Sequence, residues 1–587
     1  MPATTPPRAV RELTPIDRLA EEHLDASARL DPVAATFAGL RGHDDRLTDQ
    51  SPAGHAERAA LARSTLGRLA GLAPADDVDR VTAAALTERL QHALDLDDAG
   101  LHLSSLNNID CPVQSVREVF DVAPTATTDD WAAIARRLHA VPATLAGYRE
   151  SLLLARSGGW VPAARQVLAA AGQAAEFSAP DGFFTGLVAD AVAAPARTAG
   201  SDAAPAAARP ATLPATLTTD LAVGARAAAA AYAELDTWLR AELLPTGRAD
   251  DAVGRDVHAL TARGFLGTTI DPEETYAWGL AEVARIEARS AEVAARVVPA
   301  QVADGVSGQA LVAAAVEALD ADPARALAGT GELVAWMQRL SDEAVEALGS
   351  THFDIAEPLR RLECRIAPST AGGIYYTGPS EDFSRPGRMW WSVPPGVTSF
   401  STWRETTTVY HEGVPGHHLQ VGQTVALAGQ LNRWRRLGCW ISGHGEGWAL
   451  YAERLMEELG YLDDPGDLLG MLDGQALRAC RVVVDLGVHL RLPAPDEVGG
   501  GTWNADKAWI YLSAHTRLPE AIRRFELDRY LGWPGQAISY KVGERAWLDL
   551  RARAAAAPGF DLRTFHARAL GLGSVGLDVL RSALTLP

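Results

Sequence analysis

Three histidines and a glutamate fall within eight residues of the segment TTVYHEGVPGHHLQ, which runs from residue 407 to residue 420. They are His411, Glu412, His417 and His418, and the whole chain has only 15 histidines. Zinc hydrolases need neutral imidazoles as metal ligands and a carboxylate that stays off the metal and takes a proton from water. This cluster offers both kinds of group. We therefore predict a zinc site in which His411 is a ligand and Glu412 is the base.

The second histidine ligand depends on the path of the chain after His411. In the short His-Glu-x-x-His motif the two ligands lie one helical turn apart. Here Pro415 would clash with the carbonyl of His411 in a regular helix, so the sequence predicts a kink or bulge. An unbroken helix would return His418 to within about 20° of His411, whereas removing the bulge leaves His-Glu-x-Gly-His and selects His417. We favour His417 and keep His418 as the alternative.

A third ligand is expected from another helix, and the segment ISGHGEGWALYAERLMEELG at residues 441–460 supplies candidates. Glu446 lies 29 residues beyond His417, which is enough for a helix, a turn and a return. Glu453 falls two turns later on the same helical face, so it is placed to hold a ligand histidine from behind. His444 is the competing ligand in this segment.

These segments also resemble known families. The strings HEGVPGHHLQ, EGWALYAE and PGQAISYKVG are similar to those of the bacterial family called domain of unknown function 885, over most of the chain. More distantly, they resemble helical glutamate-zincin peptidases of the Taq carboxypeptidase, thimet oligopeptidase and angiotensin-converting enzyme families. The resemblance implies His411 and His417 as metal ligands, Glu446 as the third ligand, Glu412 as the base, and one Zn²⁺ per chain.

Two further residues are candidates for catalysis. Tyr540, followed by Gly543, resembles the Tyr-x-x-Gly element of the helical peptidases, in which a tyrosine hydroxyl donates to the oxyanion. His489 is the second candidate for this role, and it falls at helical spacing from Arg478 and Asp485. A buried tyrosine with a satisfied hydroxyl is the structural alternative for Tyr540, and a core histidine is the alternative for His489.

The elements that must position these residues are mostly helices. Apolar residues recur at three- and four-residue spacing, whereas strand-like alternation is scarce. We expect a mainly α, large two-lobed protein that encloses a deep cleft, with a small β-sheet beside the zincin-like active-site helix. Helices are predicted at 15–47, 53–71, 78–98, 129–156, 217–243, 273–297 and 308–348, and strands at 361–367, 374–377 and 387–393.

The chain is divided by composition into two predicted parts. Residues 1–350 form a helical scaffold lobe that contains an Ala/Pro-rich loop at 187–216, because this stretch has too many prolines for a continuous helix. Residues 351–587 form the zinc-hydrolase-like catalytic lobe, where aromatic residues and histidines are denser. The strand-like segment 374–393 just precedes the first motif, as the edge strand that pairs with substrate does in many zinc peptidases.

Composition bears on the binding partners and the cellular location that we expect for the protein. The 587 residues include 74 acidic and 54 basic side chains, a net charge of −20, so nucleic acid and anionic membranes are not expected partners. No apolar run approaches the length of a membrane span. The opening residues lack the apolar core of a signal peptide, and the four cysteines are widely spread. We therefore expect a cytoplasmic location.

The expected function is zinc-dependent hydrolysis of amide bonds, with Glu412 activating a zinc-bound water. By resemblance, the substrates are short peptides, and the enzyme is of carboxypeptidase, dipeptidase or oligopeptidase type. One alternative is a metal-dependent hydrolase of a non-peptide amide or ester, such as a secondary metabolite. Another is a non-catalytic binding protein that keeps the fold.

Overall fold

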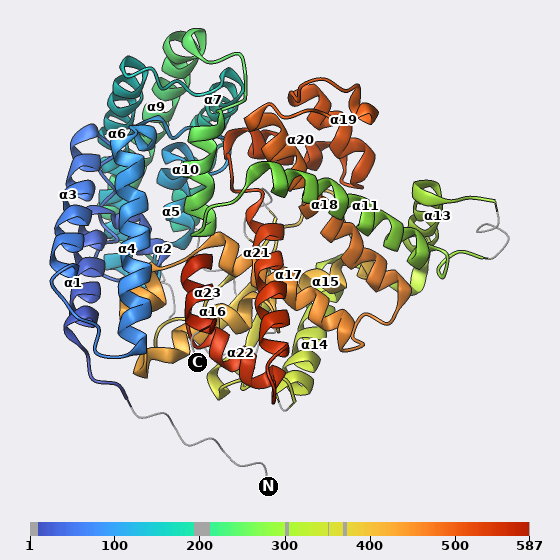
Figure 1. Ribbon diagram of the computed structural model, residues 1–587. Coiled ribbons are helices and arrows are strands. Elements are labelled where there is room, and N and C mark those ends of the chain that lie inside the picture. Colours follow the sequence, from blue (N-terminus) through green and yellow to red (C-terminus); the bar gives the residue numbers. More distant parts are fainter. Residues whose placement is uncertain (1–9, 193–211, 300–304, 350, 368–372, 586–587) are drawn as a thin grey trace.

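The computed structural model describes residues 10–192, 212–299, 305–349, 351–367 and 373–585. Helices account for most of the described residues, and the few strands are short, so the expected mainly α fold is confirmed. Figure 1 shows the earlier helices standing upright on one side of the molecule, and the helices of the second half of the chain packed on the other.

The helices on the first side come from the first 240 residues. Many begin with an ordinary N-terminal signal; α1, for example, starts at a capping Thr14 followed by proline. A hydrophobic core of its own fills the group formed by α5, α6, α7 and α9. The helices are α1 (Pro15–Leu30), α2 (Pro32–Phe37), α3 (Pro52–Leu69), α4 (Asp77–Asp98), α5 (Pro112–Val122), α6 (Thr128–Ser157), α7 (Ala164–Ser178), α8 (Phe183–Val192) and α9 (Ala215–Trp238).

The second half of the chain supplies the helices that carry the candidate site. Among them α15, α17, α18 and α21 pack directly on one another. The helices are α10 (Arg255–Leu266), α11 (Pro272–Ala294), α13 (Gly308–Asp320), α14 (Gly329–Gly349), α15 (Thr402–Glu412), α16 (His417–Ala426), α17 (Ser442–Glu458), α18 (Pro465–Leu490), α19 (Ala505–His515), α20 (Glu520–Gly532), α21 (Ser539–Ala555), α22 (Leu562–Leu570) and α23 (Leu577–Thr585).

Two small sheets adjoin the first motif. The three-stranded sheet has the order β2–β4–β3, with β2 (Leu362–Ile366) parallel and β3 (Ile374–Thr377) antiparallel to the central β4 (Gly387–Trp391). These strands confirm the three predicted ones. A second antiparallel pair joins β1 (Ala326–Ala328) to β5 (Ser399–Ser401), and β5 runs directly into α15. The pair therefore fixes the start of the helix that carries His411 and Glu412.

Three local predictions need correction. The predicted helix at 308–348 is divided between α13 and α14, because β1 and its preceding turn interrupt it. Of the predicted loop at 187–216, residues 187–192 continue α8, since this part is apolar and precedes the first proline; residues 193–211 lie outside the described part of the chain. The predicted helix at 15–47 is divided into α1 and α2 at Asp31, whose side chain caps α2, and the second helix ends at residue 37, because Gly39 and Gly42 adopt left-handed backbone conformations.

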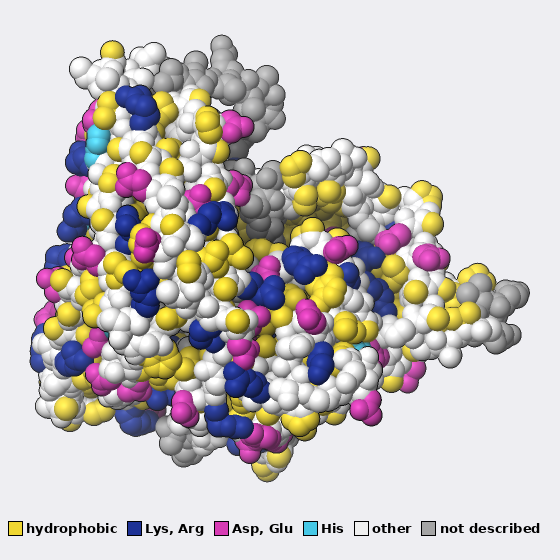
Figure 2. All heavy atoms as spheres, turned by 90° about the horizontal axis from the view of Figure 1, so that it is seen from above, with side chains coloured by type: hydrophobic (Ala, Val, Ile, Leu, Met, Phe, Trp, Pro, Cys, Tyr) yellow, Lys and Arg dark blue, Asp and Glu magenta, His cyan; other side chains and the backbone are white. Residues whose placement is uncertain are grey.

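The hydrophobic cores connect distant parts of the chain. The largest contains buried residues of α1, α3 and α4 together with residues of α17, α18 and α21. The earliest helices thus help to support the segments that carry the motifs, and the proposed division at residue 350 stays a prediction. Figure 2 shows a face that is hollowed between the two sides of the molecule, with acidic and basic side chains intermixed across it.

Candidate metal centre

The first motif is broken between two helices, as Pro415 predicts. Helix α15 ends at Glu412, and α16 begins at His417. Gly416 closes the break: a Cβ atom there would lie 1.9 Å from the carbonyl oxygen of His411, so only glycine allows this approach. The indole Nε1 of Trp448 donates to the Pro415 carbonyl oxygen at 2.8 Å and ties the break to α17.

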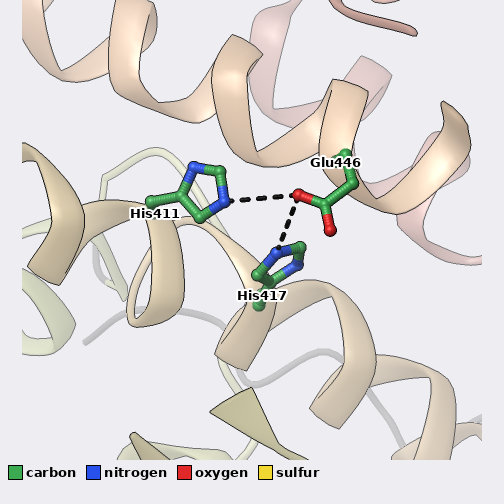
Figure 3. Close-up of side chains that lie close together, drawn as sticks. All are labelled: His411, His417 and Glu446. Atoms are coloured by element: carbon green, nitrogen blue, oxygen red, sulfur yellow. Dashed lines mark ion pairs between the residues drawn. The ribbon is translucent and has the colours of Figure 1, made fainter. Parts of the chain in front are cut away.

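The break brings His411 and His417 to face the same carboxylate. The Nε2 atom of each imidazole lies 3.5 Å from Oε2 of Glu446, which projects from the first turns of α17. Figure 3 shows the two rings converging on this oxygen. One ligand atom from each of the three residues lies within 4.8 Å of the others. We call His411, His417 and Glu446 the triad.

The two histidines of the triad are buried, Glu446 is partly exposed, and the three groups shift one another's pKa. Burial alone would lower the pKa of His411, but hydrogen bonds to Glu446 and Glu453 outweigh it and raise the pKa to about 10. Burial likewise opposes charge on Glu446, yet its two histidine partners hold the pKa of Glu446 well below its usual range. The carboxylate is therefore ionised and positioned to balance positive charge between the rings.

A second carboxylate fixes His411 from behind, as the spacing on α17 predicted. Nδ1 of His411 donates to Oε1 of Glu453 at 2.7 Å. Glu453 is buried, and this hydrogen bond outweighs the effect of burial and lowers its pKa. Because Nδ1 is held by Glu453, a metal ion that displaced the proton from Nε2 of His411 would find a lone pair directed toward Glu446 and His417.

The support for Glu453 continues into the interior through side chains from three other helices. Gln475 of α18 donates from Nε2 to Oε2 of Glu453 at 3.4 Å. The Oε1 atom of Gln475 accepts from Nζ of Lys541 at 2.9 Å, and the same ammonium donates to Glu282 at 2.9 Å. Lys541 is fully buried. Opposite charges thus compensate one another along the network.

The two competing ligand histidines point elsewhere. His418 donates from Nε2 to the Leu359 carbonyl oxygen at 2.8 Å and accepts at Nδ1 from the Tyr376 hydroxyl at 2.9 Å, so both its nitrogens are occupied. His444 packs edge-on against Trp547, with ring centroids 5.2 Å apart, and burial lowers its pKa to about 3. Neither histidine belongs to the triad.

Glu412 follows His411 at the end of α15 and lies outside the triad. It is 7 % exposed, and burial raises the pKa of its carboxyl group above the usual value, against the attraction of His417 and His411. A carboxyl group in this setting binds a proton more readily than a solvated one, which suits a group that must accept and return a proton.

Tyr540 lies at the start of α21, which crosses the first turns of α17. The two helices meet at Gly447 and Gly543: a Cβ on Gly447 would lie 2.5 Å from the Cα of Gly543. The hydroxyl of Tyr540 accepts from Nη2 of Arg529 at 3.2 Å, which leaves its proton free to donate. Among the described contacts, none joins Tyr540 directly to the triad, so its catalytic role stays a prediction.

His489 lies in surroundings typical of a core histidine. It is 0 % exposed and donates from Nε2 to the Tyr530 carbonyl oxygen at 2.9 Å. Its ring lies 5.9 Å from that of His258, which pairs with Asp485 at 2.5 Å. Nothing in these contacts directs His489 toward the triad, and its predicted role receives no support from them.

The triad fits a zinc ion by its donor set and its spacing. Two imidazole nitrogens and one carboxylate oxygen are a usual set of protein ligands for a catalytic zinc. With metal–ligand bonds of about 2.1 Å, ligand atoms at two corners of a tetrahedron lie about 3.4 Å apart. The two 3.5 Å separations from Glu446 match that spacing.

Several supporting residues could not be found from the sequence. Gln475 reaches Glu453, and Lys541 joins Gln475 to Glu282, only because α11, α18 and α21 pack together. Lys541 is one of two lysines in the chain, but nothing in its neighbours along the chain marks it as buried. Arg529 likewise reaches Tyr540 from a different helix.

Comparison with known proteins gives a family and a fold. The family model described as "Bacterial protein of unknown function (DUF885)" matches residues 32–584. A putative lipoprotein from Colwellia psychrerythraea is similar in structure, with a TM-score of 0.81 and 24% identity over 97% of this chain and 98% of the other. A putative lipoprotein of unknown function from Shewanella oneidensis gives a TM-score of 0.72 and 16% identity, over 98% and 100%. No curated protein matches the sequence.

The prediction of a cytoplasmic location is contradicted by these comparisons. Both similar structures are described as putative lipoproteins, a description that does not fit a cytoplasmic protein. The prediction relied on the opening residues, on the lack of a long apolar run and on the spread of the four cysteines. The cysteines carry little weight, because a chain that can bury large hydrophobic cores needs no disulfides in any compartment. None of the helices in the described residues is long and apolar enough to cross a membrane.

Proposed function

The chain belongs to the bacterial DUF885 family, and we propose that it is a zinc-dependent hydrolase that cleaves amide bonds of short peptides. The convergence of His411 and His417 on Glu446 carries this proposal, since both Nε2 atoms lie 3.5 Å from the same carboxylate oxygen. Adjacent Glu412 adds a buried carboxyl group that is not used in the triad.

The triad would hold the metal, and Glu453 would keep His411 in its orientation. A zinc ion bound there supplies a Lewis acid that polarises a carbonyl group and acidifies water. A zinc ion held by these two imidazoles and one carboxylate would still be able to bind water or substrate. The absence of a thiolate from this set favours zinc over copper(I) or an iron–sulfur cluster.

Glu412 is assigned the proton transfers. A water oxygen forms a bond to the carbonyl carbon while Glu412 takes its proton, and Glu412 then returns this proton to the amide nitrogen as the carbon–nitrogen bond breaks. The second hydrogen of the water stays on the new carboxyl group and then passes to the amine, so the products are a carboxylate and an ammonium group, and atoms and charges balance. Burial of Glu412 supports this role, because its raised pKa makes the protonated form accessible.

Tyr540 and the edge of the small sheet are assigned to the substrate. Because Arg529 donates to the Tyr540 hydroxyl, the phenolic proton is available to stabilise negative charge on the carbonyl oxygen. Strand β3 lies at the edge of its sheet, and Tyr376 of this strand contacts His418, the neighbour of His417. A peptide in extended conformation can pair with such an edge through main-chain hydrogen bonds.

Replacement of Glu412 by glutamine tests the proposal. An amide fills the same space but cannot take up the proton, so turnover of a short-peptide mixture should fall about 10²- to 10⁴-fold. The zinc content should match that of the wild-type protein, because Glu412 is not a member of the triad. Normal turnover in this variant would remove Glu412 from the mechanism, and zinc binding without hydrolysis of any peptide by the wild type would favour a different substrate class.

A further inference from the structure

Arg478 of α18 is a half-buried cation that forms no ion pair or hydrogen bond with a carboxylate among the described residues. Its Nη1 atom donates to the carbonyl oxygen of Gly474, one turn earlier in the same helix, at 3.1 Å. Its Nε atom is buried and has no hydrogen-bond partner. Nearby Arg481, in contrast, pairs with Glu526 at 2.9 Å. A guanidinium that is partly withdrawn from water gains most from a carboxylate or another anion.

The position of Arg478 connects it with the candidate active site. Gln475, three residues earlier, contacts Glu453 at 3.4 Å, and the guanidinium of Arg481, three residues later, lies 4.5 Å from the centre of the Tyr540 ring. Residues three apart on a helix share a face. Arg478 therefore lies on the part of α18 that runs from the support of His411 to Tyr540.

The charge of Arg478 also acts on the residues around the triad. Burial raises the pKa of Glu412, and Arg478 is among the cations that oppose this shift. For Glu453, the hydrogen bond from His411 counters burial, and the charge of Arg478 acts in the same direction as that bond. Arg478 thus lies close enough to both carboxylates for its charge to be felt there.

We propose that Arg478 binds the terminal carboxylate of the substrate, so that the enzyme releases residues from the carboxyl end of short peptides. This inference rests on the proposed peptidase function and narrows it to a carboxypeptidase or dipeptidase. A planar guanidinium with free N–H groups can hold both oxygens of a carboxylate. A peptide whose terminal carboxylate is blocked as an amide lacks this interaction.

Kinetics with a matched pair of substrates test the assignment. The zinc-loaded wild-type protein is given an N-blocked dipeptide with a free carboxylate and the same dipeptide as its carboxyl-terminal amide. We expect kcat/KM to be about tenfold or more higher for the free acid, as for loss of a charge-assisted hydrogen bond. In Arg478→Met this ratio should fall toward one, mainly through a higher KM for the acid, and Arg478→Lys should retain part of the preference.

Arg523→Met is the matched control. Arg523 is also a half-buried arginine with an unpartnered Nε, but it packs on Trp509, with its guanidinium 4.7 Å from the ring centre. This control should keep the wild-type ratio of the two substrates. The zinc content of all variants should equal that of the wild type, which shows that the triad is intact.

Binding gives a readout that does not depend on turnover. Calorimetry on zinc-loaded Glu412→Gln should show the free acid binding about tenfold or more tightly than the amide, and addition of Arg478→Met should remove the difference. If Arg478→Met and Arg478→Lys keep the wild-type preference for the acid, the assignment of Arg478 is overturned while the peptidase proposal stands. If the wild type hydrolyses neither substrate nor any other peptide, the proposed function itself fails, and this inference with it.

Discussion

Helix α17 is buried on two faces, and these faces place histidines in opposite environments. The carboxylate face, formed by Glu446 and Glu453, holds His411 through ion pairs. The aromatic face, formed by Trp448 and Tyr451, packs against His566, whose Nε2 accepts from the Tyr451 hydroxyl at 2.7 Å. His411 has a pKa raised to about 10, whereas burial lowers that of His566 to about 3.

The difference shows that burial alone does not identify a metal-binding histidine. His566 is more deeply buried than His411, at 0 % against 4 % exposure, and it stacks on Phe353 with ring centroids 4.7 Å apart. What distinguishes His411 is a carboxylate at each of its ring nitrogens. One of these carboxylates can share a cation with the imidazole, and the other orients the ring.

Among the variants that test the difference between the two faces of α17, Glu453→Gln should have the largest effect, which is a loss of zinc affinity. An amide oxygen can still accept from His411, but it no longer carries the charge that makes the imidazole a stronger ligand. Zinc affinity should fall about 10- to 100-fold, as measured by competition with a chelator of known affinity. Tyr451→Phe, on the aromatic face of the same helix, is the matched control and should bind zinc like the wild type. Equal zinc affinity in the wild type, Glu453→Gln and Tyr451→Phe would show that the carboxylate face contributes no more to zinc binding than the aromatic face does.

A smaller effect is expected from His566→Phe on the dependence of stability on pH. Because the pKa of His566 is about 3 in the folded state and near 6.5 when exposed, the unfolded chain binds more protons between these values. The free energy of unfolding therefore falls as the pH is lowered, and His566 contributes about 2 kcal/mol of the loss between pH 7 and pH 5.

The free energy of unfolding of the variant, measured by urea denaturation at pH 7 and at pH 5, should fall by about 2 kcal/mol less between these two pH values than that of the wild type. Its stability at pH 7 should be lower, because the Tyr451 hydroxyl loses its buried acceptor. An identical pH dependence in the variant and the wild type would mean that the aromatic face does not keep His566 neutral.

Much of the candidate site could be predicted because its residues lie on two short helical segments. The seven-residue spacing from Glu446 to Glu453 places both carboxylates on one face of α17, and that face indeed meets His411. The choice between His417 and His418 could not be made by counting residues, because the chain leaves the helix at Gly413 and re-enters it at His417. The close contact at Gly416 that sets this path is a property of the folded backbone.

The features of the site and the fold that could not be predicted depend on contacts between helices far apart in the sequence. The network behind Glu453 needs Gln475 and Lys541, which are 22 and 88 residues away from it. The unpaired state of Arg478 cannot be predicted from its neighbours along the chain, since many arginines occur in similar surroundings. Helices α1, α3 and α4 join the core of α17 only because the chain folds back on itself. Hydrophobic periodicity predicts such helices, but it does not say which of them pack together.

Zinc content of the purified protein, measured for the wild type, His417→Ala and His418→Ala after dialysis against zinc, tests the central claim most directly. We expect about one zinc per chain in the wild type and in His418→Ala, because both nitrogens of His418 bind within the protein. His417→Ala should lose the metal, since the triad then lacks one of its two imidazoles. Absence of zinc from the wild type, or loss of zinc in His418→Ala with retention in His417→Ala, would contradict the account.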